Sequence, residues 1–172
     1  FGPNEGQKHV PSGHPIIEMA LAKLYKVTGD EKYLNMAKYF VEETGRGTDG
    51  HKLNAYSQDH KPILQQDEVV GHAVRAGYLY SGVADVAALT HDTAYFQALT
   101  RLWNNLVGKK LYITGGMGSR PQGEGFGPNY ELNNHTAKLV LPLPMFTGIT
   151  GCSWQQVKPN TWTSWNGPCI MA

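Results

Sequence analysis

The sequence has few cysteines, few charged residues and no long hydrophobic run, and these shortages exclude several classes of protein. Its two cysteines allow two free thiols or one disulfide, and the sequence does not choose between them. No apolar run approaches the ~20 residues of a membrane span, so we expect a soluble chain without a membrane partner. The 15 basic and 14 acidic residues give a formal net charge of +1, which offers no electrostatic basis for binding nucleic acid.

The chain is long enough for one domain with a sizeable core, and 41% of its 172 residues are hydrophobic. Its composition changes near residue 138, because residues 138–172 contain no acidic residue and only two basic ones, Lys138 and Lys158. Both cysteines, Cys152 and Cys169, also lie in this part. Because the chain begins at Phe1 in a Gly- and Pro-rich segment, we expect it to be a fragment.

Two segments repeat one pattern. In each, a Gly-His pair (Gly13-His14 and Gly71-His72) precedes a stretch with helical apolar periodicity, a polar T-G-D or T-H-D turn and a second periodic stretch. Asp30 and Asp92 follow the turns, where a carboxylate can cap the next helix. The pattern predicts helical hairpins of roughly 60 residues, which must stack on neighbours to bury their apolar faces.

The segments outside the hairpins differ in character. Residues 44–66 are polar and predict a long connection between the hairpins, and Asp67 and Glu68 are expected in the first turn of the following helix. After Lys110, Leu111–Thr114 predicts a short extended piece, followed by a glycine-rich loop through Gly127. The sequence therefore predicts an all-α fold with a glycine-rich loop and an irregular tail.

Three residues are candidates for chemistry. His14 and His72 start equivalent helices, where a neutral imidazole can contact ligand hydroxyls, although a histidine satisfied by backbone groups is the alternative for each. Glu124 lies in G-E-G-F-G, an acid-poor stretch where an aromatic neighbour could raise a carboxyl pKa toward that of a general acid. A solvated loop glutamate is its alternative, and Glu131 is a weaker candidate for the same role.

The residues that carry these patterns also resemble a known family. Four stretches resemble the β-L-arabinofuranosidase family of glycoside hydrolases: G-H-P-I-I-E-M-A-L-A-K-L-Y-K-V-T-G-D-E-K-Y-L (13–34), Y-S-Q-D-H-K-P-I-L-Q-Q-D-E-V-V-G-H-A-V-R-A-G-Y-L-Y (56–80), Y-I-T-G-G-M-G (112–118) and G-E-G-F-G-P-N-Y-E-L (123–132). This resemblance covers residues 1–137. It implies an (α/α)6 barrel, of which the chain would hold about two of six helical hairpins.

The resemblance also implies site residues. Glu124 matches the family's general acid/base, and His14 and His72 match histidines that contact an arabinofuranose unit of the substrate oligosaccharide. The family's nucleophile is a cysteine thiolate on a zinc ion held by a glutamate and further cysteines. The Glu-Thr-Cys motif expected after Tyr130-Glu131-Leu132 is missing here, so we expect neither metal ligands nor zinc in this chain.

The tail suggests a reason for the missing motif. Read in the neighbouring frame with permitted codons, the stretch from His135 gives family-like sequence that includes Glu-Thr-Cys. We therefore interpret residues 138–172 as an out-of-frame tail behind a barrel fragment, residues 1–137, and the coding DNA tests this interpretation.

The resemblance thus implies a fragment of a retaining β-L-arabinofuranosidase, which we expect to be inactive without its zinc–cysteine nucleophile. A non-catalytic helical-repeat or carbohydrate-binding module is the first alternative. Another six-hairpin enzyme, such as an epimerase or a lyase, is the second, although no acid/base pair for it is evident.

Overall fold

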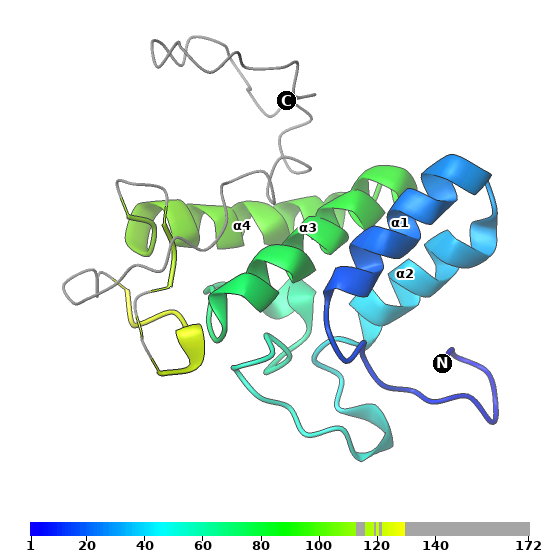
Figure 1. The fold of residues 1–172 in the computed structure, drawn as a ribbon, viewed down its shortest axis with the longest axis horizontal. Coiled ribbons are helices and arrows are strands. Elements are labelled where there is room, and N and C mark those ends of the chain that lie inside the picture. The colour runs from blue at the N-terminus through cyan, green and yellow to red at the C-terminus, as the bar shows by residue number, and fades with distance from the viewer. Residues whose placement is uncertain (113–115, 119, 121, 130–172) are drawn as a thin grey trace, which may run out of the picture.

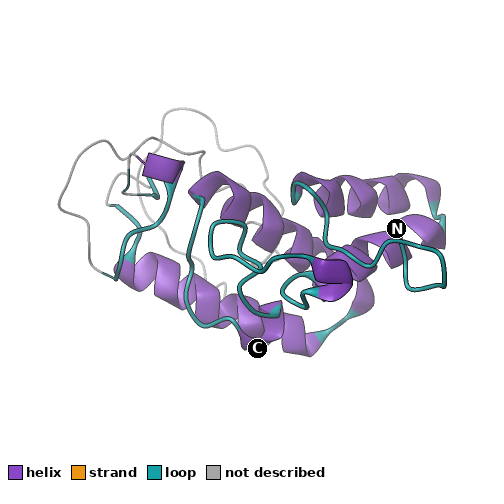
Figure 2. Ribbon diagram, turned by 90° about the horizontal axis from the view of Figure 1, so that it is seen from below, coloured by secondary structure: helices purple, strands orange, loops and turns teal. Residues whose placement is uncertain are grey.

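Four α-helices form two antiparallel hairpins. The computed structural model describes residues 1–112, 116–118, 120 and 122–129. The helices are α1 (Ile16–Thr28), α2 (Glu31–Glu43), α3 (Ala73–Thr90) and α4 (Thr93–Lys109), with short 3-10 turns η1 (Thr48–Gly50), η2 (Ile63–Gln65) and η3 (Gln122–Glu124) (Figure 1). The described residues contain helices and loops but no strand (Figure 2). The all-α prediction with two hairpins is confirmed; residues 138–172, with Cys152 and Cys169, lie outside the described residues.

Both hairpins turn in the same way. Gly29 follows the last residue of α1 and His91 follows the last residue of α3, and each of these C-cap residues has a left-handed backbone, with φ of 69° and 55°. Asp30 then accepts a hydrogen bond from the Lys32 amide, and Asp92 accepts from the amides of the first turn of α4. The predicted capping role of both aspartates is confirmed, and it satisfies amide groups that have no partner within the helix.

Helix α3 is the central element of the core. It lies between α4 and the α1–α2 hairpin (Figure 1). Most of the buried residues along α3 are small or apolar. The fully buried residues Leu79, Val83, Leu99 and Leu102 belong to one continuous cluster. Helix α1 leaves an apolar stripe exposed, which comprises Ile16, Ile17, Leu24 and Val27.

Helices α1 and α3 approach closely where Glu18 meets Gly82. A Cβ on Gly82 would lie 2.8 Å from the Glu18 Cβ, so only glycine leaves room for this side chain. Glu18 is fully buried, and its Oε1 accepts a 2.6 Å hydrogen bond from the Ser12 hydroxyl. About one turn further along α3, Asp85 pairs with Lys26 of α1 at 2.8 Å. Polar contacts therefore join the two helices at two points.

Glu18 makes the stability of the chain depend on pH. Burial raises the pKa of its carboxyl above the usual 4.5, and the Ser12 hydrogen bond and the charge of Arg75 oppose this rise. Since the folded pKa exceeds the unfolded one, the folded state binds more protons in the window above 4.5. The free energy of unfolding is therefore expected to fall as the pH rises through that window.

Glu18→Gln should flatten this slope, because the amide still offers an oxygen to Ser12 but carries no charge at any pH. Urea unfolding between about pH 4 and pH 7 measures the effect. Glu5→Gln, at an exposed position, is the matched control and should leave the slope unchanged. Equal slopes for wild type and Glu18→Gln would contradict the expectation.

The connection between the two hairpins differs from the prediction at its end, where Asp67 and Glu68 lie outside the helix. Asp67 and Glu68 are not first-turn acids, because α3 begins only at Ala73 and His72 caps it. Asp67 instead pairs with Lys61 at 2.6 Å, and Glu68 pairs with Lys110 at 2.8 Å. The predicted long connection over residues 44–66 is confirmed and contains η1 and η2.

None of the helices within the described ranges is long and apolar enough to cross a lipid bilayer.

Candidate active site

The structure brings two of the three predicted residues into contact. His72 is the N-cap of α3, and Glu124 is the last residue of η3. The His72 Nε2 atom lies 3.4 Å from Glu124 Oε2, and the two side chains are 15% and 37% exposed. The imidazole and the carboxyl therefore form one polar pair that a ligand can reach from solvent.

His14 lies at the start of the neighbouring helix and does not touch this pair. It precedes Pro15, the N-cap of α1, and its ring meets the edge of the Tyr78 ring at 5.7 Å between centroids. Partial desolvation lowers the pKa of His14, and the charges of Arg75 and His72 lower it further. His14 is thus close enough to His72 for their charges to interact, and it stays neutral at lower pH than usual.

Hydrogen bonding fixes the orientation of the His72 ring. Its Nδ1 atom accepts a 3.3 Å hydrogen bond from the Arg75 amide in the first turn of α3. Because this nitrogen accepts, the geometry assigns the ring proton to Nε2. The Nε2–H group then points to Glu124 as a donor, either to the carboxylate or to a ligand hydroxyl between them.

A buried amide network holds the backbone in front of His72. Gln58 is fully buried, and its Nε2 group donates to the carbonyl oxygens of Tyr56, Val70 and His72. Gln66 in turn donates to the carbonyl oxygens of Gln58 and Lys61 and accepts a 2.8 Å bond from the Tyr80 hydroxyl. The long connection is therefore anchored to α3, which makes the position of His72 rigid.

The glycine-rich loop reaches this site through main-chain pairing. His72 and Gly125 form an antiparallel bridge, and the Phe126 amide donates to the Gly71 carbonyl oxygen at 2.8 Å. Glu124 has a φ of 47°, which is unusual for a residue with a side chain. Phe126, two residues further on, belongs to the buried core cluster, and Lys110 Nζ lies 5.8 Å from the centre of its ring.

Sequence reasoning missed Tyr56. Its ring meets the His72 ring edge-on at 5.3 Å, and a Cβ on Gly123 would lie 3.6 Å from it. Tyr56 therefore borders the same pair from the connection between the hairpins. The quoted motif Y-S-Q-D-H contains it, but no spacing rule connects residue 56 with residue 72.

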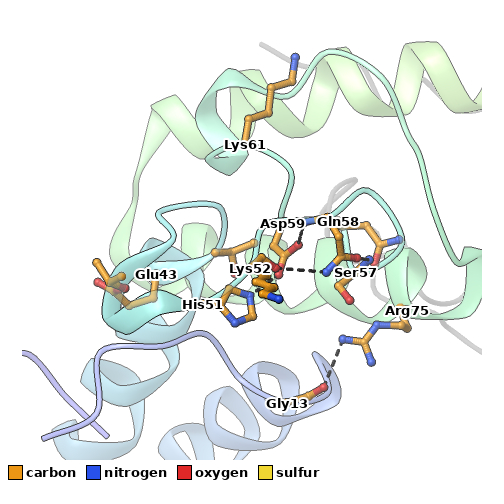
Figure 3. A network of polar contacts seen from close by, with 12 residues as sticks. Gly13, Glu43, His51, Lys52, Ser57, Gln58, Asp59, Lys61 and Arg75 are labelled. Carbon is orange, nitrogen blue, oxygen red and sulfur yellow. Dashed lines mark hydrogen bonds and ion pairs between the residues drawn. The ribbon is translucent and has the colours of Figure 1, made fainter.

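A cavity of about 360 Å³ with a mixed polar and apolar lining lies near the pair, and Arg75 from the first turn of α3 is one of its lining residues. His51 and Asp59 line it and contact each other at 2.5 Å, and Ser57 lies next to them (Figure 3). Neither His72 nor Glu124 lines this cavity. The cavity and the His72–Glu124 pair are neighbours, because Tyr56 contacts the His72 ring and the next residue, Ser57, lines the cavity.

The described residues do not fit the zinc centre that the family resemblance implies. Within them, no group of three or more His, Cys, Asp or Glu side chains is placed to hold a metal ion. The chemistry available at this site is that of an imidazole donor and a carboxyl group.

Comparisons with known proteins agree with this reading. The family model "Beta-L-arabinofuranosidase, GH127 catalytic domain" matches residues 1–140. A non-reducing end β-L-arabinofuranosidase of Bifidobacterium longum subsp. longum is 38% identical over 154 residues, which cover 79% of this chain and 23% of that protein.

The solved structures to which this chain is similar include members of the same family. A GH127 β-arabinofuranosidase is 54% identical with a TM-score of 0.73, over 77% of this chain and 20% of that one. A GH127 β-L-arabinofuranosidase from Geobacillus stearothermophilus T6 is 39% identical with a TM-score of 0.71, over 77% and 23%. The chain thus spans less than a quarter of the length of these relatives, and its hairpins are part of an (α/α)6 barrel. It belongs to the GH127 β-L-arabinofuranosidase family of glycoside hydrolases.

Proposed function

We propose that this chain carries the acid/base glutamate and the sugar-contacting histidines of a retaining β-L-arabinofuranosidase. The 3.4 Å contact between His72 Nε2 and Glu124 Oε2 is the observation that supports this most directly. A carboxyl that is partly exposed and faces an N–H donor can meet both a glycosidic oxygen and a sugar hydroxyl. The relatives that bear the name β-L-arabinofuranosidase suggest which sugar is bound.

Each residue has a separate role in this proposal. Protonated Glu124 gives its proton to the leaving glycosidic oxygen, and the resulting carboxylate later removes a proton from the attacking water. His72 donates from Nε2 to the Glu124 carboxylate or to a sugar hydroxyl, because its Nδ1 is already engaged by Arg75. His14, neutral above its lowered pKa, contacts a second hydroxyl from the start of α1.

We further propose that this chain alone does not hydrolyse the glycoside. The reason is the sequence, which lacks the Glu-Thr-Cys motif that the family uses for its nucleophile. General acid/base catalysis contributes about 10²–10⁴-fold in rate, which does not replace a nucleophile held against the anomeric carbon. The residues of this chain would then bind the sugar without completing the reaction.

Binding of methyl β-L-arabinofuranoside tests the site. Titration of the chain, followed through histidine NMR signals, should give saturable shifts for His72 and His14. His72→Ala should raise the dissociation constant about tenfold, because one hydrogen bond to a bound hydroxyl is lost. His91→Asn is the matched control, since His91 lies at the opposite end of α3 and asparagine tolerates its left-handed backbone.

Hydrolysis of an aryl β-L-arabinofuranoside tests the proposed inactivity of the chain and the role of Glu124. We expect no turnover by the wild type or by Glu124→Gln. Turnover that disappears in Glu124→Gln would contradict the proposed inactivity and support the catalytic role. Unchanged sugar affinity in His72→Ala would contradict the site itself. The alternative, a carbohydrate-binding module, would be favoured by a different result. In that case the sugar affinity would depend on both histidines, and Glu124→Gln would not change it at any pH.

A further inference from the structure

Arg75 connects the loops that carry the two candidate histidines. Its main-chain amide donates to His72 Nδ1 at 3.3 Å. Its Nη2 atom donates to the carbonyl oxygen of Gly13 at 3.2 Å, and Gly13 directly precedes His14 (Figure 3). One residue of α3 therefore contacts both the ring of one histidine and the backbone next to the other, although 62 residues separate Gly13 from Arg75.

Glu18 holds the same loop from the other side. Its Oε1 atom accepts the 2.6 Å hydrogen bond from Ser12, the residue before Gly13. Glu18 is fully buried in α1, and the charge of Arg75 opposes the effect of this burial on its carboxyl. The short segment Ser12–Gly13 is thus fixed to α1 through Glu18 and to α3 through Arg75.

The buried polar atoms of Glu18 and Arg75 cost folding free energy, so stability alone does not explain this arrangement. Glu18 Oε2 and Arg75 Nε are buried without a hydrogen-bond partner among the atoms that the structure describes. Apolar side chains of similar volume commonly stabilise a buried position at least as well as charged ones. Buried polar groups that fix a local geometry are instead typical of the residues that support a binding site.

We propose that Arg75, together with Glu18, is a positioning residue that sets the separation and mutual orientation of His14 and His72. The placement of the histidines is a property of the chain by itself. Its consequence for sugar binding rests on the proposed function. Arg75 does not need to touch the sugar for this role, because its guanidinium acts through the Gly13 backbone and its main-chain amide acts through the His72 ring.

Two substitutions separate geometry from charge. Arg75→Met removes the guanidinium and its positive charge but preserves much of the apolar stem. Arg75→Lys retains the charge but cannot reproduce the planar set of donors, so the Gly13 contact is lost or displaced. Asp85→Asn is the matched control, because it breaks the Lys26–Asp85 link between the same two helices at a point away from the two histidines.

NMR of the full chain provides readouts that need no ligand. The first is the contact between the His14 and Tyr78 rings, seen as nuclear Overhauser effects; the second is the His14 titration curve. In Arg75→Met the ring contact should weaken at least twofold, and the His14 pKa should rise. In Arg75→Lys the contact should weaken while the pKa stays low. Asp85→Asn should change neither.

The outcomes are distinct. Full ring contact in both Arg75 variants would overturn the proposal, and so would an equal loss in Asp85→Asn. If Arg75→Met does not fold, as judged by circular dichroism, Arg75→Lys and Ser12→Ala still test it, since Ser12→Ala removes only the hydrogen bond to Glu18.

A last experiment measures the affinity of wild type and Arg75→Lys for methyl β-L-arabinofuranoside. The affinity should fall about fivefold in Arg75→Lys. If the wild type shows no binding while the ring contacts respond as expected, the proposed function fails and the positioning role stands. If the wild type binds and Arg75→Lys binds equally well with intact ring contacts, the positioning role fails and the proposed function stands.

Discussion

Gly71→Ala is expected to lower the free energy of unfolding by about 3 kcal/mol or more. Gly71 has a φ of 75°, and a Cβ there would lie 1.9 Å from the carbonyl oxygen of Ala55 and 2.6 Å from that of Tyr56. Both contacts are with backbone atoms, which a rotamer change cannot relieve. The loop would have to move away from the start of α3, where Gly71 also accepts the Phe126 amide.

Urea unfolding of the full chain measures this loss, with Gly108→Ala as the matched control. Gly108 lies inside α4, and a Cβ there meets nothing within 4 Å. Alanine is the better helix former by about 0.5–1 kcal/mol, so the control should be neutral or slightly more stable than wild type. Similar stability of the two variants would show that the loop around Gly71 yields without cost.

Gln66→Leu is expected to cost about 3 kcal/mol, because it removes three hydrogen bonds worth about 1 kcal/mol each. The side chain is fully buried and of similar size to leucine, so the loss comes from polar contacts and not from a cavity. The carbonyl oxygens of Gln58 and Lys61 lose their donor, and the Tyr80 hydroxyl loses this acceptor. The effect should reach His72, since Gln58 donates to its carbonyl oxygen.

The neighbouring Gln65 offers a control, because it is exposed and Gln65→Leu should change stability by no more than about 0.5 kcal/mol. Thermal or urea unfolding compares the two variants, and the His72 NMR signal reports on the site. A Gln66→Leu protein as stable as Gln65→Leu, with an unshifted His72 signal, would show that the amide network does not support the site.

The sequence was sufficient for the helices because their signals are local. Apolar periodicity and the aspartates after each turn depend on neighbours within one or two turns of helix, and Asp30 and Asp92 cap α2 and α4 as predicted. The start of α3 was misjudged for the same reason. Asp67 and Glu68 look like first-turn acids, but their ion pairs with Lys61 and Lys110 hold them in an irregular segment before the helix.

The candidate site was only partly predictable. The family motifs single out His72 and Glu124, but their contact depends on a bridge between segments about fifty residues apart. Arg75 carries no signal of its own, since its role depends on which loop packs beside α3. Glu18 looks like an ordinary acid near a helix start; it is buried because Gly82 leaves a space on another helix.

The backbone at Glu124 has a consequence for how such a site can be lost. Gly123 and Glu124 have consecutive positive φ values of 74° and 47°, and this backbone sets the direction in which the Glu124 side chain leaves the main chain. A change at Gly123 that forbids this twist would turn the acid away while every reactive group remained in the protein. An inventory of its chemical groups would count such a variant as intact, although its acid no longer faced the imidazole.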